Sequence, residues 1–566
     1  MPTLHSHATY WQSVWQQFRR HRLGLIAFWI LCLFIIVGIY APFLASSKPL
    51  VVYFQGQWYF PLFRYLFYPG FFTKRLDIFY NLLIFTVPLF LVAWWSLRVY
   101  PQLKKWMALA MIVLQIGLFI FIIMDPPLDP TRSRLSRTLP QSVLSSQSYL
   151  LLSKPYPEWS STLDELTPYG QLNLVLRYQQ RKRQYDHLQM YEEAYLKQVQ
   201  QRGQQHPLFP LLWVLDRSQD QKARQRAEKT LQELNPHYAS AKFVFNLMNQ
   251  RCHVPYTSML NHPLIICDFL NHLLTQDHAF LHEAKRLVEK VERTQAQIKY
   301  SQERQEWLEI QTKQLQFEIM PLLRPFHWQD DAGGDQGLNH FIKWWDLTRI
   351  NRTDMVASLL FGIRVSLSVG LLAIALALSI GIPIGAFAGY YGGKIDLISY
   401  RLIEIWESMP TFFMLLMIVA FLQSKSIFLI IGVIGFFGWT GFSRFIRGEF
   451  FRQKQLLYTE ACRALGYSDL RIIFSHLLPN AIPPLLTLIP FAMMGAITSE
   501  AGLSFLGLGE EGSSSWGVLM DEGRSAFPSE SYLLWPPAIL LTLLLVAIAL
   551  IGDALRDALD PKLHQV

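Results

Sequence analysis

The chain has 566 residues, of which 51% are hydrophobic and 16% charged, and its formal net charge is +9 at pH 7. Its apolar residues come in long runs, which excludes an ordinary soluble protein of this length and indicates several spans in contact with membrane lipid. Lys and Arg gather beside these runs, as the positive-inside rule expects, and the sequence shows no nucleic-acid-binding motif. We therefore expect membrane lipid, and no nucleic acid, among the partners.

The first 77 residues predict one membrane span. Residues 1–22 are polar and basic and are expected in the cytoplasm, and residues 23–44 form an apolar run that is longer than the core of a signal peptide. We interpret this run as an uncleaved first span. Residues 45–77 are then periplasmic, and they are rich in aromatic side chains, which are typical of a membrane interface.

Residues 78–124 predict two further spans, at 78–97 and 106–124. The basic residues between them place this short loop in the cytoplasm. If both spans cross, the chain returns to the periplasm at residue 125.

Residues 125–343 contain no run that is long and apolar enough to span, and we expect this insert to be a periplasmic domain. Its composition predicts long helices at Leu172–Arg202, Gln219–Leu234 and His278–Met320. The last has apolar residues at heptad-like spacing. That spacing fits a helical hairpin or short coiled coil, or a plain amphipathic helix packed on its own domain.

Cys252 and Cys267 both lie in this insert. An oxidising periplasm permits a disulfide between them, and two buried thiols are the alternative. We find no convincing set of metal ligands in the sequence, so we expect no bound metal.

Residues 344–566 predict five more spans, at 364–388, 410–422, 426–445, 481–508 and 532–551. The string G-Y-Y-G-G-K-I at 389–395 needs comparison with the phosphate-binding P-loop. Ala388 stands where the first Gly should be, Ile395 stands where Ser or Thr should be, and the string ends a span instead of following a strand. We reject a P-loop, and we expect the chain itself to bind no ATP and no other cofactor.

The polar, basic segment Tyr458–Asn480 separates two of these spans. Its composition is helical up to Leu465, and Gly466 then predicts the left-handed turn that ends a helix. A second helical run over 469–478 is expected to end at Pro479. Two short helices joined by a Gly at the membrane face would form a knob that docks into another protein. An ordinary amphipathic helix-turn-helix between spans is the alternative.

This segment carries a family resemblance. Glu460-Ala461-Cys462, then Gly466, then His476-Leu477-Leu478-Pro479 resemble the EAA signature of ABC importer permeases. Further segments resemble the dipeptide, oligopeptide and nickel subgroup in family order, namely 350–370, 499–509, 513–524 and 552–561. The string V-V-Y-F-Q-G-Q-W-Y-F-P at 51–61 is similar to the Yej branch (microcin C and oligopeptide). The chain is identified as a member of this family, closest to its C-type subunit.

The resemblance implies an all-α polytopic membrane protein with the type I ABC importer transmembrane fold. This chain would add to that fold two extra N-terminal spans (78–124) and a large helical extramembrane insert (125–343). It also implies a bacterial inner-membrane location with both termini cytoplasmic, and import of di- or oligopeptides or peptide-like compounds. The implied partners are a homologous permease subunit, two cytoplasmic ATPase domains that bind the ATP, and a periplasmic substrate-binding protein.

In this family the EAA loop, here 446–480, sits in a cleft of the ATPase. The resemblance therefore assigns coupling to six positions: Glu460, Ala461, Gly466, Asp469, His476 and Pro479. Glu460 would anchor the first short helix through hydrogen bonds or an ion pair. No residue is expected to do covalent chemistry, so the chain would not be an enzyme. Glu500, an acid in an apolar setting, either faces a translocation path or is an interfacial residue with a polar partner.

Two alternatives stay open at this point. The same machinery could import nickel or a peptide antibiotic, although the spans lack a His or Met cluster. The chain could instead be a non-transporting scaffold or receptor that works through its insert, but such a protein has no physical need of an intact EAA loop.

Overall fold

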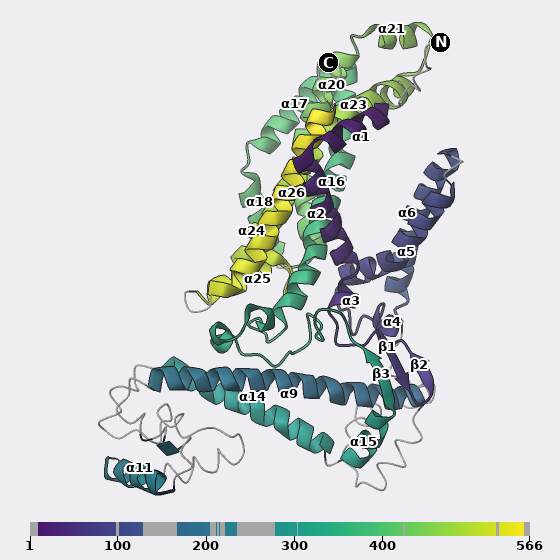
Figure 1. Ribbon diagram of the computed structural model, residues 1–566. Helices are drawn as coiled ribbons and strands as arrows, with labels where there is room; N and C mark the ends of the chain where they lie inside the picture. The colour runs from purple at the N-terminus through teal and green to yellow at the C-terminus, as the bar shows by residue number, and fades with distance from the viewer. Residues whose placement is uncertain are drawn as a thin grey trace. The chain divides into compact units, whose positions relative to one another are not determined.

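The structure is a computed structural model that describes residues 10–97, 101–127, 167–203, 211, 214–215, 221–234, 278–302, 304–422, 425–527 and 531–559 (Figure 1). The chain divides into two compact units, which we treat separately. The membrane unit comprises Met1–Ala41, Phe79–Gln115 and Ser358–Val566, and the insert unit comprises Pro42–Ile78 and Ile116–Ala357.

Seven helical segments in the described part of the chain are long and apolar enough to cross a membrane. They are α2 (Arg22–Ile39), α5 (Arg75–Ser96), α6 (Pro101–Met124), α16 (Met355–Tyr391), α19 (Ile427–Phe437) with α20 (Trp439–Gln453), α24 (Ile489–Leu503) with η9 (Ser504–Leu508), and α26 (Trp535–Leu559). An eighth candidate is the pair α17 (Gly393–Glu407) and α18 (Thr411–Leu422), which is bent by 72°. The eight segments follow the order of the eight predicted spans, which confirms a mostly helical, polytopic fold.

Within the membrane unit, α2 and α26 run side by side (Figure 1). Gly24 permits their close approach, because a Cβ there would lie only 2.2 Å from the Cβ of Ala554. The amphipathic helix α1 (Tyr10–Arg20) buries Val14 and Phe18 against the same end of α26. Small residues at such contacts let helix backbones approach closely, which is how helices pack where lipid offers no hydrophobic drive.

The two predicted extra spans, α5 and α6, differ in how far they are buried. Tyr80, Asn81 and Thr86 of α5 are buried, whereas α6 is exposed along nearly all of its apolar length. The Thr86 hydroxyl donates to Gln115 Oε1 at 2.8 Å, and the Gln115 amide donates to the Phe79 carbonyl at 3.1 Å. These two buried hydrogen bonds tie α6 to α5.

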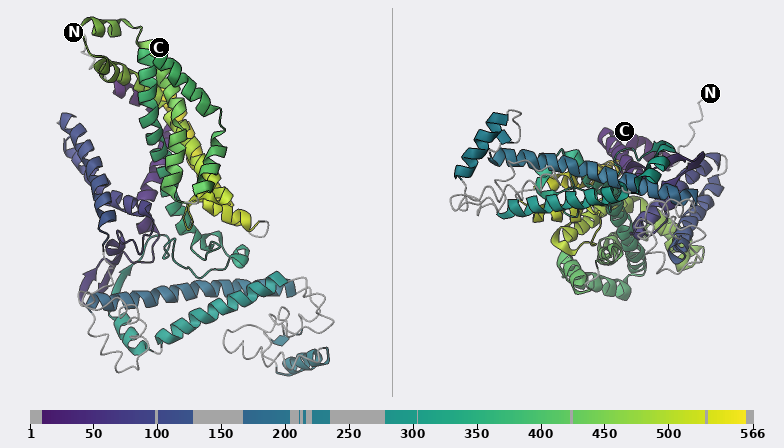
Figure 2. Two further views of the ribbon diagram at one scale, coloured as in Figure 1. Left: turned by 180° about the vertical axis from the view of Figure 1, so that it is seen from behind. Right: turned by 90° about the horizontal axis from the view of Figure 1, so that it is seen from below.

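The insert unit is built on two long antiparallel helices that lie side by side (Figure 2). Its helices are α9 (Pro168–Gly203), α11 (Gln221–Leu234), α14 (His278–Gln302) and α15 (Gln305–Lys313). Leu188 and Tyr191 of α9 pack against Leu287 and Val291 of α14. Residues 204–277 separate α9 from α14, so the two do not form a hairpin joined by a short loop, and the contacts match the alternative of an amphipathic helix packed on its own domain.

The prediction of one helix from His278 to Met320 is wrong at the C-terminal end. It stops at Gln302, α15 follows, and the chain then forms a strand, β3 (Leu315–Ile319). The sequence L-Q-F-E-I alternates apolar and polar residues, which is the period of a strand. β3 joins β1 (Val51–Phe54) and β2 (Gln57–Tyr59) in an antiparallel sheet of order β2-β1-β3. The fold is therefore mostly helical with one small sheet added.

One face of this sheet is buried. Val52 and Phe54 of β1 pack against Leu172 and Val175 at the start of α9. The turn between β1 and β2 has two residues, and both have positive φ, 49° at Gln55 and 77° at Gly56. Such a turn matches the twist of paired strands, so it fixes the hairpin tightly.

Shorter elements complete the two units. In the insert unit these include α4 (Pro61–Tyr65), η6 (Gln336–Phe341) and η7 (Trp344–Asp346), and α3 (Ala41–Leu44) precedes them. In the membrane unit they are α21 (Leu457–Ala464), α22 (Asp469–Arg471), the π-helix η8 (Ile472–Leu477), α23 (Leu478–Leu486), α25 (Trp516–Ser525) and η10 (Ser531–Leu533).

Candidate coupling loop and the polar sites around it

The first helix of the predicted EAA loop ends as expected at Gly466. That residue has φ 75°, its N–H donates to the Arg463 carbonyl at 2.9 Å, and the Tyr467 N–H donates to the Cys462 carbonyl at 3.1 Å. This pair of bonds is the Schellman motif, which satisfies the last carbonyls of a helix and needs a left-handed residue. The predicted left-handed turn is confirmed.

The second helical run does not end at Pro479, so that prediction is wrong. α22 is followed without a break by η8 and α23, and the run continues to Leu486. Proline has no N–H and its ring collides with a carbonyl one turn back in a regular α-helix. Here the Leu478 N–H donates to the Ile473 carbonyl five residues earlier, so the chain is in a π-turn just where Pro479 follows.

The outward face of the loop combines apolar side chains with an unpaired acid. Leu457, Leu465 and Leu470 are exposed by 82%, 70% and 56% of their surface. Glu460 and Ala461 are also exposed, and the Glu460 carboxylate makes no hydrogen bond or ion pair with any residue that the structure describes. The expected anchor for Glu460 is therefore not made within this part of the chain, and its carboxylate is available to a partner.

The inward side of the loop is held to the membrane unit. The buried Thr459 hydroxyl donates to the Gln453 carbonyl at 2.9 Å. The Tyr390 hydroxyl, at the end of α16, donates to Asp469 Oδ1 at 2.6 Å. His476 stacks on Tyr467, with ring centroids 5.5 Å apart and planes at 13°. The Asp469 bond therefore connects the loop to α16, whereas the Thr459 and His476 contacts lie within the loop itself.

Glu500 lies at the junction of α24, η9 and α25. It is buried, and its Oε1 accepts hydrogen bonds from the Ser504 and Ser515 hydroxyls, both at 2.7 Å. Ser515 also caps α25, because its hydroxyl accepts from the Gly517 N–H. Glu500 therefore has polar partners within its own chain, and its expected role, on a translocation path or at an interface, stays a prediction.

Arg364 is fully buried in the middle of α16. Its guanidinium donates to the carbonyls of Gly38 and Ile39, at 2.7 and 3.2 Å, and to Asn81 Oδ1 at 3.0 Å. It also lies 4.8 Å from the centre of the Phe361 ring. The two carbonyls are at the C-terminal end of α2, where the helix dipole favours a cation. Arg364 therefore joins α2, α5 and α16, inside the helix bundle as its charge requires.

Two parts of the chain match known protein families. Residues 381–565 match the family described as the binding-protein-dependent transport system inner membrane component, and residues 9–61 match the N-terminal TM domain of oligopeptide transport permease C. The oligopeptide transport system permease protein OppC of Haemophilus influenzae is 38% identical over 210 residues, which are 37% of this chain and 67% of that protein. The chain belongs to this family of inner membrane components.

For two other relatives, the matched segment covers a smaller share of the relative's length. The peptidoglycan transport system permease protein YejE of Agrobacterium fabrum is 39% identical over 219 residues, 38% of this chain and 57% of that protein. The inner membrane ABC transporter permease protein YejE of Escherichia coli is 37% identical over 219 residues, 38% of this chain and 64% of that protein. The chain thus spans about three fifths of the length of these two relatives.

The family match places the predicted site residues unevenly. The loop at 446–480 and Glu500 lie inside the matched range 381–565, whereas most of α16, both extra helices and the insert lie between the two matched ranges. Cys252 and Cys267 lie outside the described residues, so their pairing stays a prediction. Among the residues that the structure describes, no group of three or more His, Cys, Asp and Glu side chains could hold a metal ion.

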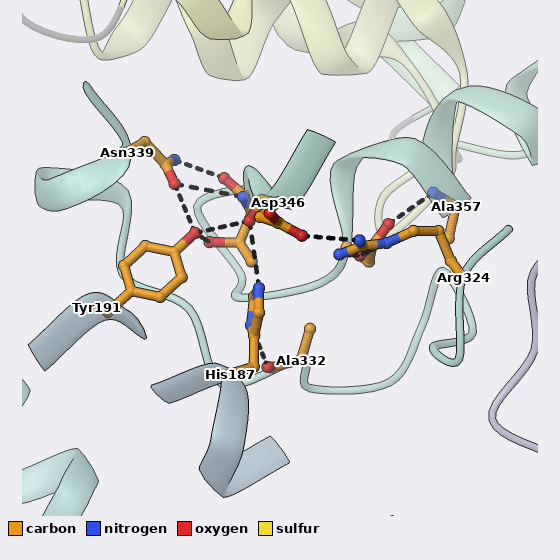
Figure 3. Close-up of polar contacts among 9 residues, drawn as sticks. His187, Tyr191, Arg324, Ala332, Asn339, Asp346 and Ala357 are labelled. Carbon is orange, nitrogen blue, oxygen red and sulfur yellow. Dashed lines mark hydrogen bonds and ion pairs between the residues drawn. The ribbon is translucent and has the colours of Figure 1, made fainter. Parts of the chain in front are cut away.

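Sequence reasoning missed a polar network that joins α9 to the segment before α16 (Figure 3). Arg324 donates to Asp354 Oδ2 at 2.7 Å and to Asp346 Oδ1 at 2.9 Å. From α9, the His187 ring nitrogens lie 2.7 Å from the Ala332 carbonyl and 3.3 Å from the Asp346 carbonyl. The residues of this network are far apart in the sequence. Only Asp354 lies in a segment with a motif, 350–370, that could have indicated the network.

Three further hydrogen bonds complete this network. The Tyr191 hydroxyl donates to Asn339 Oδ1 at 2.8 Å, and the Asn339 amide donates to the Thr348 carbonyl at 2.7 Å. Asp354 Oδ1 accepts from the Ala357 N–H at 2.8 Å and so caps the start of α16. Burial lowers the pKa of His187 and raises the pKa of Tyr191, so both are neutral near pH 7.

Proposed function

We propose that the chain is the permease subunit of an ABC importer that moves di- or oligopeptides, or peptide-like compounds, across the inner membrane. The observation that carries this proposal is the EAA loop, in which the left-handed Gly466 joins α21 to the helical run Asp469–Leu486 and the loop presents exposed leucines and an unpaired Glu460. The relatives, which are named as permeases of oligopeptide and peptidoglycan transport systems, support a peptide-like cargo.

The proposal includes partners and topology. A separate ATPase subunit would bind the loop from the cytoplasm, a homologous permease would complete the pore, and a periplasmic binding protein would deliver the cargo. Both termini would be cytoplasmic and the insert periplasmic. This topology follows from the predicted spans and from the basic residues beside them.

The loop geometry supports a mechanical route for coupling. α22, η8 and α23 form one continuous helical run from Asp469 to Leu486, directly before α24. A displacement of the loop by the ATPase would therefore move the run as a rod and tilt the spans behind it. Glu500, held by two serines, would keep α24 fixed to α25 during this movement.

The test is ATP-dependent uptake of a labelled oligopeptide by vesicles that hold the whole complex. Gly466→Val should abolish most uptake, because a β-branched residue at φ 75° is strained by about 1–2 kcal/mol or more. Gly466→Asn is the matched control, since Asn tolerates the left-handed region, and it should keep most uptake.

The possible results separate the alternatives. Equal uptake by the Val and Asn variants, with both proteins in the membrane, would refute coupling through this turn. No uptake by the wild type in spite of a bound ATPase would point to another cargo, such as nickel or a peptide antibiotic. A wild type that neither transports nor binds an ATPase would point to a scaffold.

A further inference from the structure

The sheet of the insert unit has a second face that is rich in apolar side chains. Residues that pair across antiparallel strands share a face, and Tyr53 pairs with both Trp58 and Phe317. Next to this row, Val51 pairs with Ile319, and Phe60 follows two residues after Trp58 on the same side. We call these six side chains the outer face: Val51, Tyr53, Trp58, Phe60, Phe317 and Ile319.

A β-bulge in β3 determines which of its residues lie on the outer face and which lie on the buried face. The pairing of β1 with β3 shifts by one residue after Tyr53, so Leu315 lies opposite Phe54 and packs toward α9. Beyond the bulge, Phe317 and Ile319 turn to the opposite side. A one-residue shift exchanges the two faces of a strand, so the bulge lets one short strand supply apolar residues to both.

The outer face is exposed in spite of its composition. Trp58, Phe60, Phe317 and Ile319 expose 57%, 48%, 46% and 40% of their surface. The Trp58 ring centre lies 4.9 Å from that of Tyr53 and 5.9 Å from that of Phe317, so the aromatic residues form one continuous surface. A contiguous apolar patch of this kind marks a binding or membrane surface.

The patch continues to the end of the first span. The Phe60 and Phe63 ring centres are 6.2 Å apart, and those of Phe63 and Phe43 are 5.5 Å apart. Phe43 follows the last residue of α2 by only four positions. The Leu322 N–H donates to the Phe43 carbonyl at 3.1 Å, and the Leu322 side chain is 82% exposed. Apolar side chains therefore lead from the outer face to the point where the chain leaves the membrane.

The charges on the sheet also fit a lipid surface. The acid of β3, Glu318, points to the buried side, where Arg183 of α9 pairs with it at 2.9 Å. Arg64 lies on that side as well, where its guanidinium is 3.9 Å from the centre of the Tyr169 ring. The outer face is therefore uncharged, and an uncharged surface rich in Trp, Tyr and Phe is typical of the membrane–water interface.

We propose that the outer face inserts into the headgroup region of the bilayer and anchors the insert to the membrane surface. β1 and β2 precede the insert and β3 follows its last helix, so one lipid contact would hold both ends of this domain. This proposal requires α2 to be a span, but it requires neither transport nor an ATPase.

The experiment places the photoreactive residue benzoylphenylalanine at position 317 of the full chain, in vesicles of phosphatidylethanolamine and phosphatidylglycerol. The control is the same residue in place of Met190, which is 37% exposed on α9. Met190 is 15 positions beyond the Val175 that packs under the sheet, or about 22 Å along a helix. After irradiation, mass spectrometry should find lipid adducts at position 317 in several-fold excess over position 190.

A second probe at Trp58 reads the same face from a different strand, so disruption of β3 alone cannot decide the outcome. Lipid adducts at both 58 and 317 would support the proposal. An equal yield of lipid adducts at position 190 would overturn the proposal. Protein adducts in place of lipid adducts at 58 and 317 would also overturn it, and they would assign the outer face to a protein partner.

Discussion

The proposed coupling loop and the polar network of the insert unit are both rich in polar side chains, but they differ in whether those side chains have partners within the chain. In the network, Arg324 is 6% exposed at its side chain and lies between two carboxylates of the same chain. In the loop, Glu460 is exposed and has no partner among the described residues, and leucines surround it. A closed set of contacts stabilises the chain itself, whereas an open set has its partner elsewhere.

This contrast separates folding from function. Changes in the closed network should lower stability, and changes on the open face of the loop should lower binding while the fold stays intact. The three predictions below use this difference, from the largest expected effect to the smallest.

The largest effect is expected for Arg324→Met. Asp354 is fully buried, and loss of the guanidinium would leave its carboxylate without the opposite charge. Removing one member of a buried ion pair costs about 3 to 5 kcal/mol. The midpoint of thermal unfolding in detergent should fall strongly.

The control for that variant is Arg352→Met. Arg352 lies 3.2 Å from Asp331, but Asp331 is 43% exposed at its side chain. Such partly solvated pairs contribute at most about 1 kcal/mol, so the midpoint should change little. Equal shifts in the two variants would show that the network is not the closed structure described above.

An intermediate effect is expected for Leu465→Asp in the loop. This side chain is 70% exposed, so the unfolding midpoint should not change. A charge in an apolar contact should weaken binding of the ATPase subunit at least about tenfold, or 1.4 kcal/mol. Binding is measured by titration of purified ATPase on the membrane-embedded complex. Loss of stability with unchanged binding would contradict the contrast between the two regions.

The smallest effect concerns pH. Burial holds the pKa of His187 below its usual value of 6.5, so the unfolded chain takes up a proton that the folded chain does not. The stability that the folded chain gains by keeping His187 neutral is thus fully present above pH 6.5. This stability is lost as the pH falls from 6.5 through the pKa that His187 has in the folded state. In His187→Gln, the unfolding midpoint should fall less between pH 7 and pH 5 than in the wild type. Identical slopes would remove His187 from the account.

The sequence predicted the parts of the fold that depend on local pattern. The spans follow from runs of apolar residues, and the turn at Gly466 follows from the one residue type that adopts positive φ without strain. These features need no knowledge of what lies beside them in space.

The errors arose where distant residues decide local structure. Leu315–Ile319 was assigned to a helix because the helical pattern precedes it, but pairing with β1, more than 250 residues earlier, makes it a strand. The run through Pro479 depends on a π-turn that composition does not indicate. The network around Arg324 joins α9 to residues more than 130 positions later, so no window of sequence contains it.

The most direct test of the central claim is photo-crosslinking from position 465 in the assembled, ATP-hydrolysing complex. With benzoylphenylalanine in place of Leu465, the account predicts a covalent adduct with the ATPase subunit. No such adduct is expected from Leu543 of α26, which is 41% exposed on a membrane span. An active complex that forms no adduct at 465, or forms it equally at 543, would contradict the assignment of this loop as the contact with the ATPase.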